Sequence, residues 1–269
     1  MPLLLTNSEE EIFANGFEMH GINHSSPSAL NHWAEAPCSW ISQYLYGNKG
    51  KFSAAAKAGV LVEEALVNIL ARGWTAEQAV KAACDGYNRF IAIGATDADL
   101  KRGDGIADMI MLALEELKPF GEPEFDRDGI TGDAKQKKVE VTCRAENFSI
   151  PIIGFIDFHF PKHGKIIDLK TTARMPSEMS SSHLRQQAVY RQAFGNQEVC
   201  FLYVTPKKSQ MFSPEGHKET LAEIKTILTR QERFLSLGDR ELLRSIVPVA
   251  TDSFYWSGNE STRRTMYGI

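Results

Sequence analysis

The sequence has few cysteines, and none of them belongs to a metal-binding motif. No two of the four are spaced as in a zinc or iron–sulfur site: Cys38, Cys84, Cys143 and Cys200. Scattered cysteines of this kind are typical of reduced, buried residues in an intracellular protein. The sequence therefore predicts neither a zinc site nor an iron–sulfur cluster.

Long apolar runs and an excess of basic residues are also missing. The chain starts with MPLLLTNSEEEIF, a short apolar run without a basic leader, and no later run is long enough to span a bilayer. We therefore expect a cytoplasmic protein without a membrane segment. The net charge is −4, so any contact with nucleic acid has to come from a local basic groove.

The order of hydrophobic patterns predicts a single α/β or α+β domain over 1–269. Its part at about 24–118 is mostly helical, with capping signals at Ser53 and Thr75, and the sheet follows at about 137–237. The predicted strands cover 137–144, 150–160, 165–171 and 199–204, and the later helices cover 183–194 and 214–237. The tail at 251–269 has no clear period. This order favours a central mixed sheet flanked by helices.

The candidate chemistry lies in one stretch, GFIDFHFPKHGKIIDLKTT. With PKHG as the loop of a hairpin, Asp157 lies opposite Asp168. Because side chains alternate along a strand, Asp157, Asp168 and Lys170 then share one face. The apolar residues between them are predicted to point the other way, into a core: Ile156, Phe158, Ile167 and Leu169.

Two carboxylates opposed across antiparallel strands destabilise a sheet unless something lies between them. A divalent cation removes the repulsion, and hard oxygen ligands suit magnesium or manganese. A nearby lysine ammonium stabilises charge that develops on a phosphate, or orients an attacking water. The stretch thus predicts a site of metal-assisted hydrolysis. A surface hairpin in which Lys170 pairs with its acids is the alternative.

At these residues the sequence resembles a known family. GFID at 154–157, DLKT at 168–171 and QQAVY at 186–190 are similar to the motifs G-x-x-D, D-x-K-T and Q-x-x-x-Y of the PD-(D/E)XK nuclease superfamily. The likeness is greatest to its RecB-like branch, which includes CRISPR-associated and phage exonucleases, and it extends from His24 to about Val204. It implies a restriction-endonuclease-like core.

The first motif of this branch, G-x-x-x-H-E-x-L, is matched with one departure. In GVLVEEAL at 59–66, Glu63 stands in the position of the metal-binding histidine. Other branches of the superfamily use a glutamate from this helix, so the resemblance implies a site with a third carboxylate. Glu64 is the substitute candidate, and two solvated acids on a helix are the alternative.

The resemblance implies a role for each matched residue. The aspartates and the glutamate would hold one or two Mg²⁺ ions, for which Mn²⁺ can substitute. The lysine would orient the water or stabilise the transition state, and the glutamine and tyrosine would position the lysine or the scissile phosphate. The implied catalytic residues are Lys170, Asp157, Asp168, Gln186 and Tyr190, and the implied metal ligands are Glu63, Asp157, Asp168 and the backbone carbonyl of Leu169.

Contacts to the phosphates of DNA are expected from basic side chains near the motifs and from a helix N-terminus. Ordinary solvated side chains are the alternative for each. These candidates are Ser25, Ser28, Arg174, Arg185, Lys207 and Lys208.

Taken with the resemblance, these residues predict a magnesium-dependent deoxyribonuclease, most simply an exonuclease that processes DNA ends in replication, recombination, repair or phage DNA metabolism. The expected partners are single- or double-stranded DNA ends and a recombination or replication protein, and a homo-oligomer remains open. One rival is a degenerate nuclease fold that binds nucleic acid or a partner without cutting. Another is a metalloenzyme that acts on small phosphoesters.

Overall fold

The computed structural model describes residues 15–50, 52–129, 133–141, 148–195 and 197–269. The chain start, Cys143 and the end of the strand predicted at 137–144 lie outside these ranges. Helices dominate the N-terminal part: α1 (Gly16–Met19), α2 (Pro27–Glu35), α3 (Pro37–Tyr44), α4 (Ala54–Ala71), α5 (Ala76–Ile91), α6 (Asp97–Asp104) and α7 (Ile106–Leu117), with the 3-10 turn η1 (Lys118–Phe120). Later come α9 (Ser181–Phe194), α10 (Lys218–Leu235), α11 (Arg240–Ile246), η3 (Phe254–Trp256) and α12 (Glu260–Tyr267).

A mixed sheet lies at the centre, and the predicted mixed α/β class is confirmed. Its four strands run in the order β5 (Phe158–Phe160), β6 (Lys165–Thr171), β7 (Glu198–Val204) and β8 (Ser209–Phe212). Strands β6 and β7 are parallel, and the other two pairs are antiparallel. Helix α9 connects β6 to β7, since a parallel pair needs a crossover. Two smaller ladders pair β1 (Asp126–Arg127) with β2 (Ala134–Lys135) and β3 (Lys137–Val141) with β4 (Ile152–Ile156).

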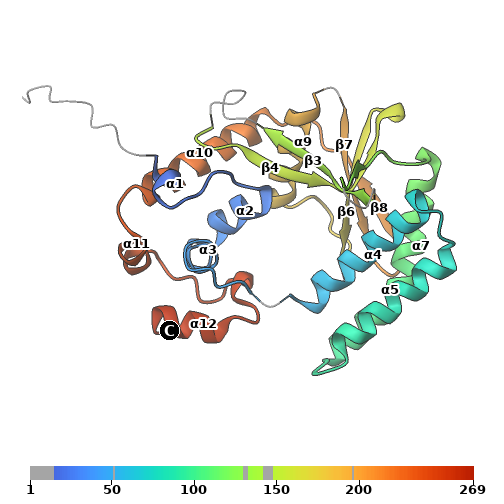
Figure 1. Cartoon of the computed structure of the whole chain (residues 1–269), viewed down its shortest axis with the longest axis horizontal. Helices are drawn as coiled ribbons and strands as arrows, with labels where there is room; N and C mark the ends of the chain where they lie inside the picture. Colours follow the sequence, from blue (N-terminus) through green and yellow to red (C-terminus); the bar gives the residue numbers. More distant parts are fainter. Residues whose placement is uncertain (1–14, 51, 130–132, 142–147, 196) are drawn as a thin grey trace, which may run out of the picture.

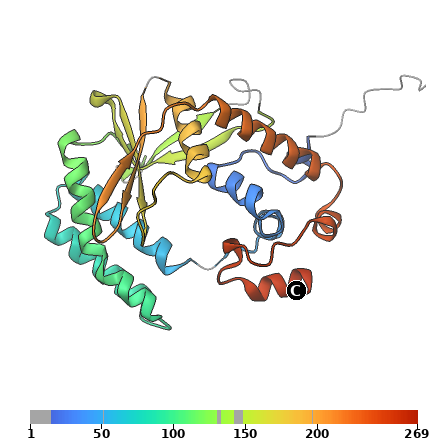
Figure 2. The same ribbon diagram turned by 180° about the vertical axis from the view of Figure 1, so that it is seen from behind.

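Helices cover both faces of the sheet, and each face has its own core. Figures 1 and 2 show α4, α5 and α7 on one side and α2, α3, α9 and α10 on the other. The first core joins Leu66 and Ile110 to Phe158 and Ile167. The second core joins residues of α2, α3, α9 and α10 to residues of β3, β4 and β7. Strand β7 is buried on both faces from Val199 to Val204, which explains its continuous apolar run.

Local signals set the helix starts as expected. The Ser53 side chain accepts the Ala56 N–H and caps α4, and Thr75 and Gln78 form the predicted capping box of α5. Three differences stand out. The predicted strand at 150–160 is broken at Asp157, the short strand β8 follows β7, and the tail contains α12.

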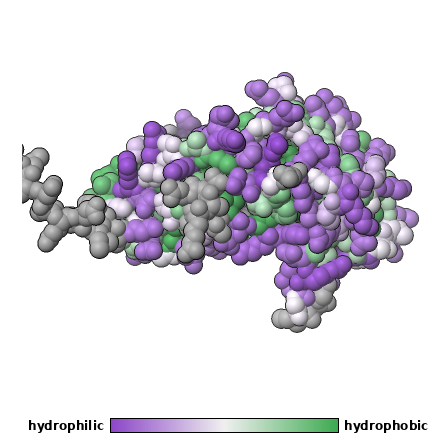
Figure 3. Space-filling view, turned by 90° about the horizontal axis from the view of Figure 1, so that it is seen from above, coloured by the Kyte–Doolittle hydropathy of each residue, from purple (hydrophilic) through white to green (hydrophobic). Residues whose placement is uncertain are grey.

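Among the described residues, no helix is both long and apolar enough to cross a membrane. Cys38 and Cys200 are buried and Cys84 is half-buried, and all three are free thiols. The face seen in Figure 3 is mainly hydrophilic, with smaller hydrophobic patches along its middle.

Candidate active site

The hairpin register that the sequence predicts is present. Phe160 pairs with Lys165 and Phe158 with Ile167, so the next position brings Asp157 opposite Asp168. The loop is the 3-10 turn η2 (Pro161–His163), closed by Gly164 in the left-handed region at φ 58°, where glycine carries no steric penalty. The two aspartates are therefore neighbours, as expected, and both are buried.

The apolar residues around them do not all point the same way, which corrects one prediction. Phe158, Ile167 and Leu169 enter the core beneath α4 and α7, as expected. Ile156 is equally buried but enters the core beneath α9. The chain bends at Asp157 between β4 and β5, so the alternation is interrupted there, and Asp157 lies where the chain passes from one core to the other.

Backbone and side-chain donors fix the Asp157 carboxylate. Oδ2 accepts the backbone N–H of Leu169 at 2.7 Å, and Oδ1 accepts an amide hydrogen bond from Gln136 at 2.7 Å. The resemblance implies a metal contact by the Leu169 carbonyl, whereas the contact of Leu169 with Asp157 in this structure is made by its backbone N–H. Gln136 lies between β2 and β3, across from Asp157, because the next residue, Lys137, pairs with Ile156.

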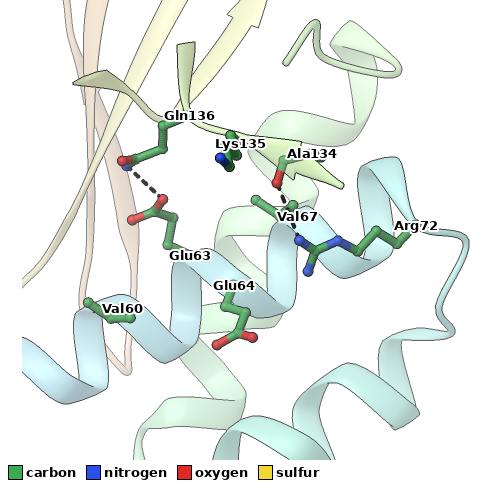
Figure 4. A pocket seen from close by; sticks show the side chains of 8 residues that line it. All are labelled: Val60, Glu63, Glu64, Val67, Arg72, Ala134, Lys135 and Gln136. Atoms are coloured by element: carbon green, nitrogen blue, oxygen red, sulfur yellow. Dashed lines mark hydrogen bonds between the residues drawn. The ribbon is translucent and has the colours of Figure 1, made fainter. Parts of the chain in front are cut away.

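Helix α4 supplies the third carboxylate. A Cβ at Gly59 would lie 3.0 Å from the Thr171 hydroxyl, so glycine there permits the close approach of α4 to β6. One turn later, Glu63 Oε1 accepts a 2.8 Å hydrogen bond from the Gln136 amide. Glu64 is exposed and lies on another side of the helix (Figure 4). The structure thus favours Glu63 over Glu64 as a member of the cluster.

The lysine pairs with the second aspartate. Lys170 Nζ and Asp168 Oδ2 form an ion pair on one face of β6, and the lysine side chain is 22% exposed. The other carboxylate oxygen of Asp168 accepts a 3.0 Å hydrogen bond from Gln186 Nε2. Lys170 therefore has its charge at the edge of the buried cluster, with a route to solvent.

Gln186 and Tyr190 lie one turn apart on α9 and form a chain of hydrogen bonds behind Asp168. Gln186 Nε2 donates to the Tyr190 hydroxyl at 2.8 Å, and this hydroxyl donates to the Phe155 carbonyl at 2.6 Å. A Cβ at Gly154 would approach the Tyr190 ring to 2.6 Å, so the glycine of the GFID motif makes room for the tyrosine. Gln186 thus contacts Asp168 rather than Lys170, and Tyr190 is bound to Gln186.

The cluster contains three carboxyl groups and one ammonium, and burial and mutual repulsion raise the pKa values of the carboxyl groups. Burial raises the pKa of Asp157 well above its ordinary value, and the charges of Asp168 and Glu63 raise it further. Burial and the Asp168 charge raise the pKa of Glu63 to about 7. Burial also raises the pKa of Asp168, against the opposing effect of Lys170. Three carboxyls share one ammonium, so an additional cation would relieve their repulsion.

Lys170 responds in the opposite sense. Burial alone would lower the pKa of its ammonium, but attraction to Asp168, Asp157 and Glu63 outweighs burial, and its pKa is raised. The lysine therefore stays protonated at neutral pH. It is suited to donate hydrogen bonds and stabilise negative charge rather than to accept a proton.

The donor chemistry of the cluster fits a hard divalent cation, because Glu63, Asp157 and Asp168 offer carboxylate oxygens from three segments. In the part of the chain that the structure describes, no three acidic, histidine or cysteine groups are yet arranged around one point as metal ligands. The Gln136 amide lies between Glu63 and Asp157, and Lys170 contacts Asp168. A cation would have to rearrange these contacts.

A pocket of about 280 Å³ opens beside the cluster, between α4 and the β2–β3 segment. Figure 4 shows Glu63 and Gln136 meeting at its wall, and Arg72 reaching across to the Ala134 carbonyl. The remaining lining residues are Val60, Glu64, Val67 and Lys135. Of the three carboxylates, Glu63 lines this pocket, so the pocket reaches the Glu63 and Gln136 side of the cluster.

Three of the candidate phosphate contacts gather at one end of the sheet. Arg174 follows β6, Lys207 and Lys208 follow β7, and all three side chains are exposed. Because β6 and β7 are parallel, these side chains lie at the end of the sheet that carries Lys170. Among the six predicted phosphate contacts, these three basic side chains lie at the same end of the sheet as Lys170.

The other candidates are placed differently. Arg185 is 6% exposed and donates hydrogen bonds to Asn31 at 2.6 Å and to Glu223 at 2.7 Å, so its guanidinium links α9 to α2 and α10, which does not favour the predicted phosphate contact. Ser25 is buried, with its backbone paired to the start of β4. Ser28 is exposed and bonds to Ser26, the cap of α2.

Comparison with known proteins adds little to this geometry. No family model and no curated protein matches the chain. A solved structure described as "Crystal structure of SSO0001" is 19% identical and covers 65% of this chain and 87% of that chain, with a TM-score of 0.29. A TM-score this low does not establish a common fold.

Proposed function

We propose that this chain is a metal-dependent nuclease that hydrolyses phosphodiester bonds in DNA, with a PD-(D/E)XK-type core. The observation that carries the proposal is the convergence of Glu63, Asp157 and Asp168 with Lys170, linked by the Gln136 hydrogen bonds and by the ion pair between Lys170 and Asp168. The order of the motifs along the sequence supports the same function. The basic side chains at the Lys170 end of the sheet suit a phosphate backbone.

In this proposal Glu63, Asp157 and Asp168 would hold Mg²⁺ or Mn²⁺, which supplies Lewis acidity and an activated water when bound. Lys170, kept protonated by its acidic neighbours, donates to the phosphate oxygens as negative charge develops in the transition state. Gln186 fixes one oxygen of Asp168, which leaves the other oxygen facing Lys170. Tyr190 fixes Gln186 in turn.

The test is digestion of end-labelled linear DNA and closed circular DNA, each single- and double-stranded, in Mg²⁺ and in EDTA. We expect cleavage in Mg²⁺ and none in EDTA. Lys170→Met should lower the rate by about 100-fold or more, the usual effect of losing one transition-state donor. Digestion of circular DNA separates endonucleolytic from exonucleolytic cleavage.

Lys165→Met is the matched control. Lys165 lies on the same strand, its side chain is 19% exposed, and it pairs with Glu198 at 2.9 Å at the far end of β6. This variant should cleave DNA as the wild type does. If both lysine variants lose activity equally, or if Lys170→Met retains it while folded, Lys170 has no special role.

A second candidate function is binding without cleavage. The observation that favours it is the closed set of hydrogen bonds and ion pairs within the cluster, together with glutamate in place of the histidine of the RecB-like motif. Stoichiometric DNA binding with no products from any of the four substrates, even in millimolar Mn²⁺, would select this function.

A further inference from the structure

Gln136 occupies a position that the motifs do not assign. Its single amide nitrogen donates to Glu63 Oε1 at 2.8 Å and to Asp157 Oδ1 at 2.7 Å. These two oxygens come from α4 and from the β4–β5 bend, segments that no backbone ladder joins in the described structure. One side chain thus bridges two of the three carboxylates, and it holds their two oxygens close to the same amide nitrogen.

A primary amide has two faces of opposite polarity. Its N–H₂ group donates twice, and its carbonyl oxygen accepts or binds a hard cation. Between two carboxylates and without a cation, the N–H₂ face is the favourable one, and this is the arrangement observed. With a cation between the same carboxylates, the electrostatic preference reverses and favours the carbonyl oxygen.

Gln136 also has room and access for such a turn. It is half-buried and lines the pocket beside the cluster, together with Glu63 and Ala134. Figure 4 shows its side chain among those that line the pocket, with its amide directed toward Glu63. A cation that enters through this pocket meets Gln136 and Glu63 first.

We propose that Gln136 belongs to the cation site: its amide bridges Glu63 and Asp157 when the site is empty and turns its carbonyl oxygen to the ion when a divalent cation enters. The inference rests on the cation site of the proposed function, but on no step of DNA cleavage. It assigns Gln136 as an oxygen ligand in addition to the three carboxylates. Three carboxylates and one amide carbonyl would offer only hard oxygen ligands, which suit Mg²⁺ and Mn²⁺.

The experiment is Mn²⁺ binding to the whole chain without DNA, measured by electron paramagnetic resonance and by isothermal titration calorimetry. Gln136→Met keeps the length of the side chain and removes both polar faces, and it should weaken Mn²⁺ binding by about tenfold or more. Gln136→Glu keeps an oxygen ligand and should restore affinity, although it loses the bridge in the metal-free protein. A purely structural bridge predicts no loss of Mn²⁺ affinity in Gln136→Met, because removing it would free the Glu63 and Asp157 oxygens for the ion.

Gln197→Met is the control, since Gln197 is also half-buried and hydrogen-bonded, to His159 at 2.8 Å, and it should bind Mn²⁺ normally. If Gln136→Met does not fold, Gln136→Asn serves instead, because its side chain is one methylene shorter and its amide cannot reach the position between both carboxylates. Wild-type affinity in either folded variant, or no restoration by Gln136→Glu, would overturn the assignment. Absence of Mn²⁺ binding by the wild type would overturn both proposals, whereas Mn²⁺ binding with the expected variant effects but no DNA cleavage would overturn only the nuclease.

Discussion

Replacing Glu63 by glutamine should make the metal-free protein more stable at high pH, although it removes a proposed metal ligand. Burial and Asp168 raise the pKa of Glu63 from 4.5 to about 7 in the folded protein. Between these two pH values the folded state binds more protons at this site than the unfolded state. The unfolding free energy of the wild type therefore falls as pH rises through this window, and the loss is complete above about pH 7.

The magnitude follows from the same pKa difference. A change from 4.5 to about 7 corresponds to at most about 3 kcal/mol of unfolding free energy. Glu63 is partly exposed, so screening by solvent reduces this to on the order of 1–2 kcal/mol. Glutamine keeps an oxygen that accepts the Gln136 hydrogen bond. We therefore expect Glu63→Gln to gain on the order of 1–2 kcal/mol at pH 8 and little at pH 4.5.

The assay is urea unfolding of both proteins in EDTA at several pH values between 4.5 and 8. Burial lowers the pKa of His32 and of His183 to about 4, which lowers stability as pH falls, but both histidines are present in both proteins and cancel in the difference. Glu64→Gln, on the exposed side of α4, should show no such gain. In saturating Mg²⁺ the gain of Glu63→Gln should shrink or reverse, because the wild type then binds the ion more tightly.

A result of the opposite sign would refute the reasoning. If Glu63→Gln were less stable than the wild type at pH 8 in EDTA, Glu63 would be a stabilising partner rather than an uncompensated acid. A difference that did not change with pH would mean that the Glu63 carboxyl is not raised in pKa within the fold.

Three further changes test the surroundings of the site by urea unfolding and by DNA cleavage. Tyr190→Phe leaves the Phe155 carbonyl without its donor and should cost about 1–3 kcal/mol. Gly154→Ala forces the Tyr190 ring to move and should cost about 1–3 kcal/mol of unfolding free energy. Both Tyr190→Phe and Gly154→Ala should cleave DNA more slowly, and unchanged stability in either would contradict this packing. Arg185→Met leaves the buried Asn31 side-chain oxygen without its donor and should cost about 1–3 kcal/mol without weakening DNA binding by the folded protein; a lower affinity would support a role in DNA binding.

Much of the fold could be predicted where the signal is local. The caps at Ser53 and Thr75 mark helix starts because their side chains bond to amides within the next turn. The short loop at Pro161 to Gly164 fixes the register of β5 and β6 without reference to distant residues. Both predictions are confirmed for this reason.

Elements whose stability depends on distant neighbours were not predicted. Strand β8 is a short edge strand without alternation, and only its pairing with β7 identifies it. Helix α12 has no apolar period of its own, and it is held by contacts to α3 such as the 2.8 Å hydrogen bond from Tyr267 to the Cys38 carbonyl. A sequence pattern carries no record of such partners.

The candidate site divides in the same way. Asp157, Asp168 and Lys170 could be predicted because one hairpin brings them together. Gln136 could not, because its place opposite Asp157 depends on the register between β3 and β4, two strands joined by a long connection. The burial of Arg185 and its partners Asn31 and Glu223 could not be predicted either, because a basic residue near a motif gives no signal of distant partners.

The break of the strand at Asp157 affects both the fold and the candidate site. A continuous strand over 150–160 would keep its ladder and its alternation, and it would place Ile156 and Phe158 together on the face opposite Asp157. Instead the chain bends where it passes between the two cores, and two buried aspartates and a glutamate come together with a single ammonium. Such an arrangement lowers the stability of the metal-free fold. Local rules tend to fail at functional sites, and under the proposed function a bound cation would recover the stability lost at this bend. We therefore expect the cation site to depend on the bend: a substitution that straightens the strand should stabilise the metal-free protein and abolish Mn²⁺ binding.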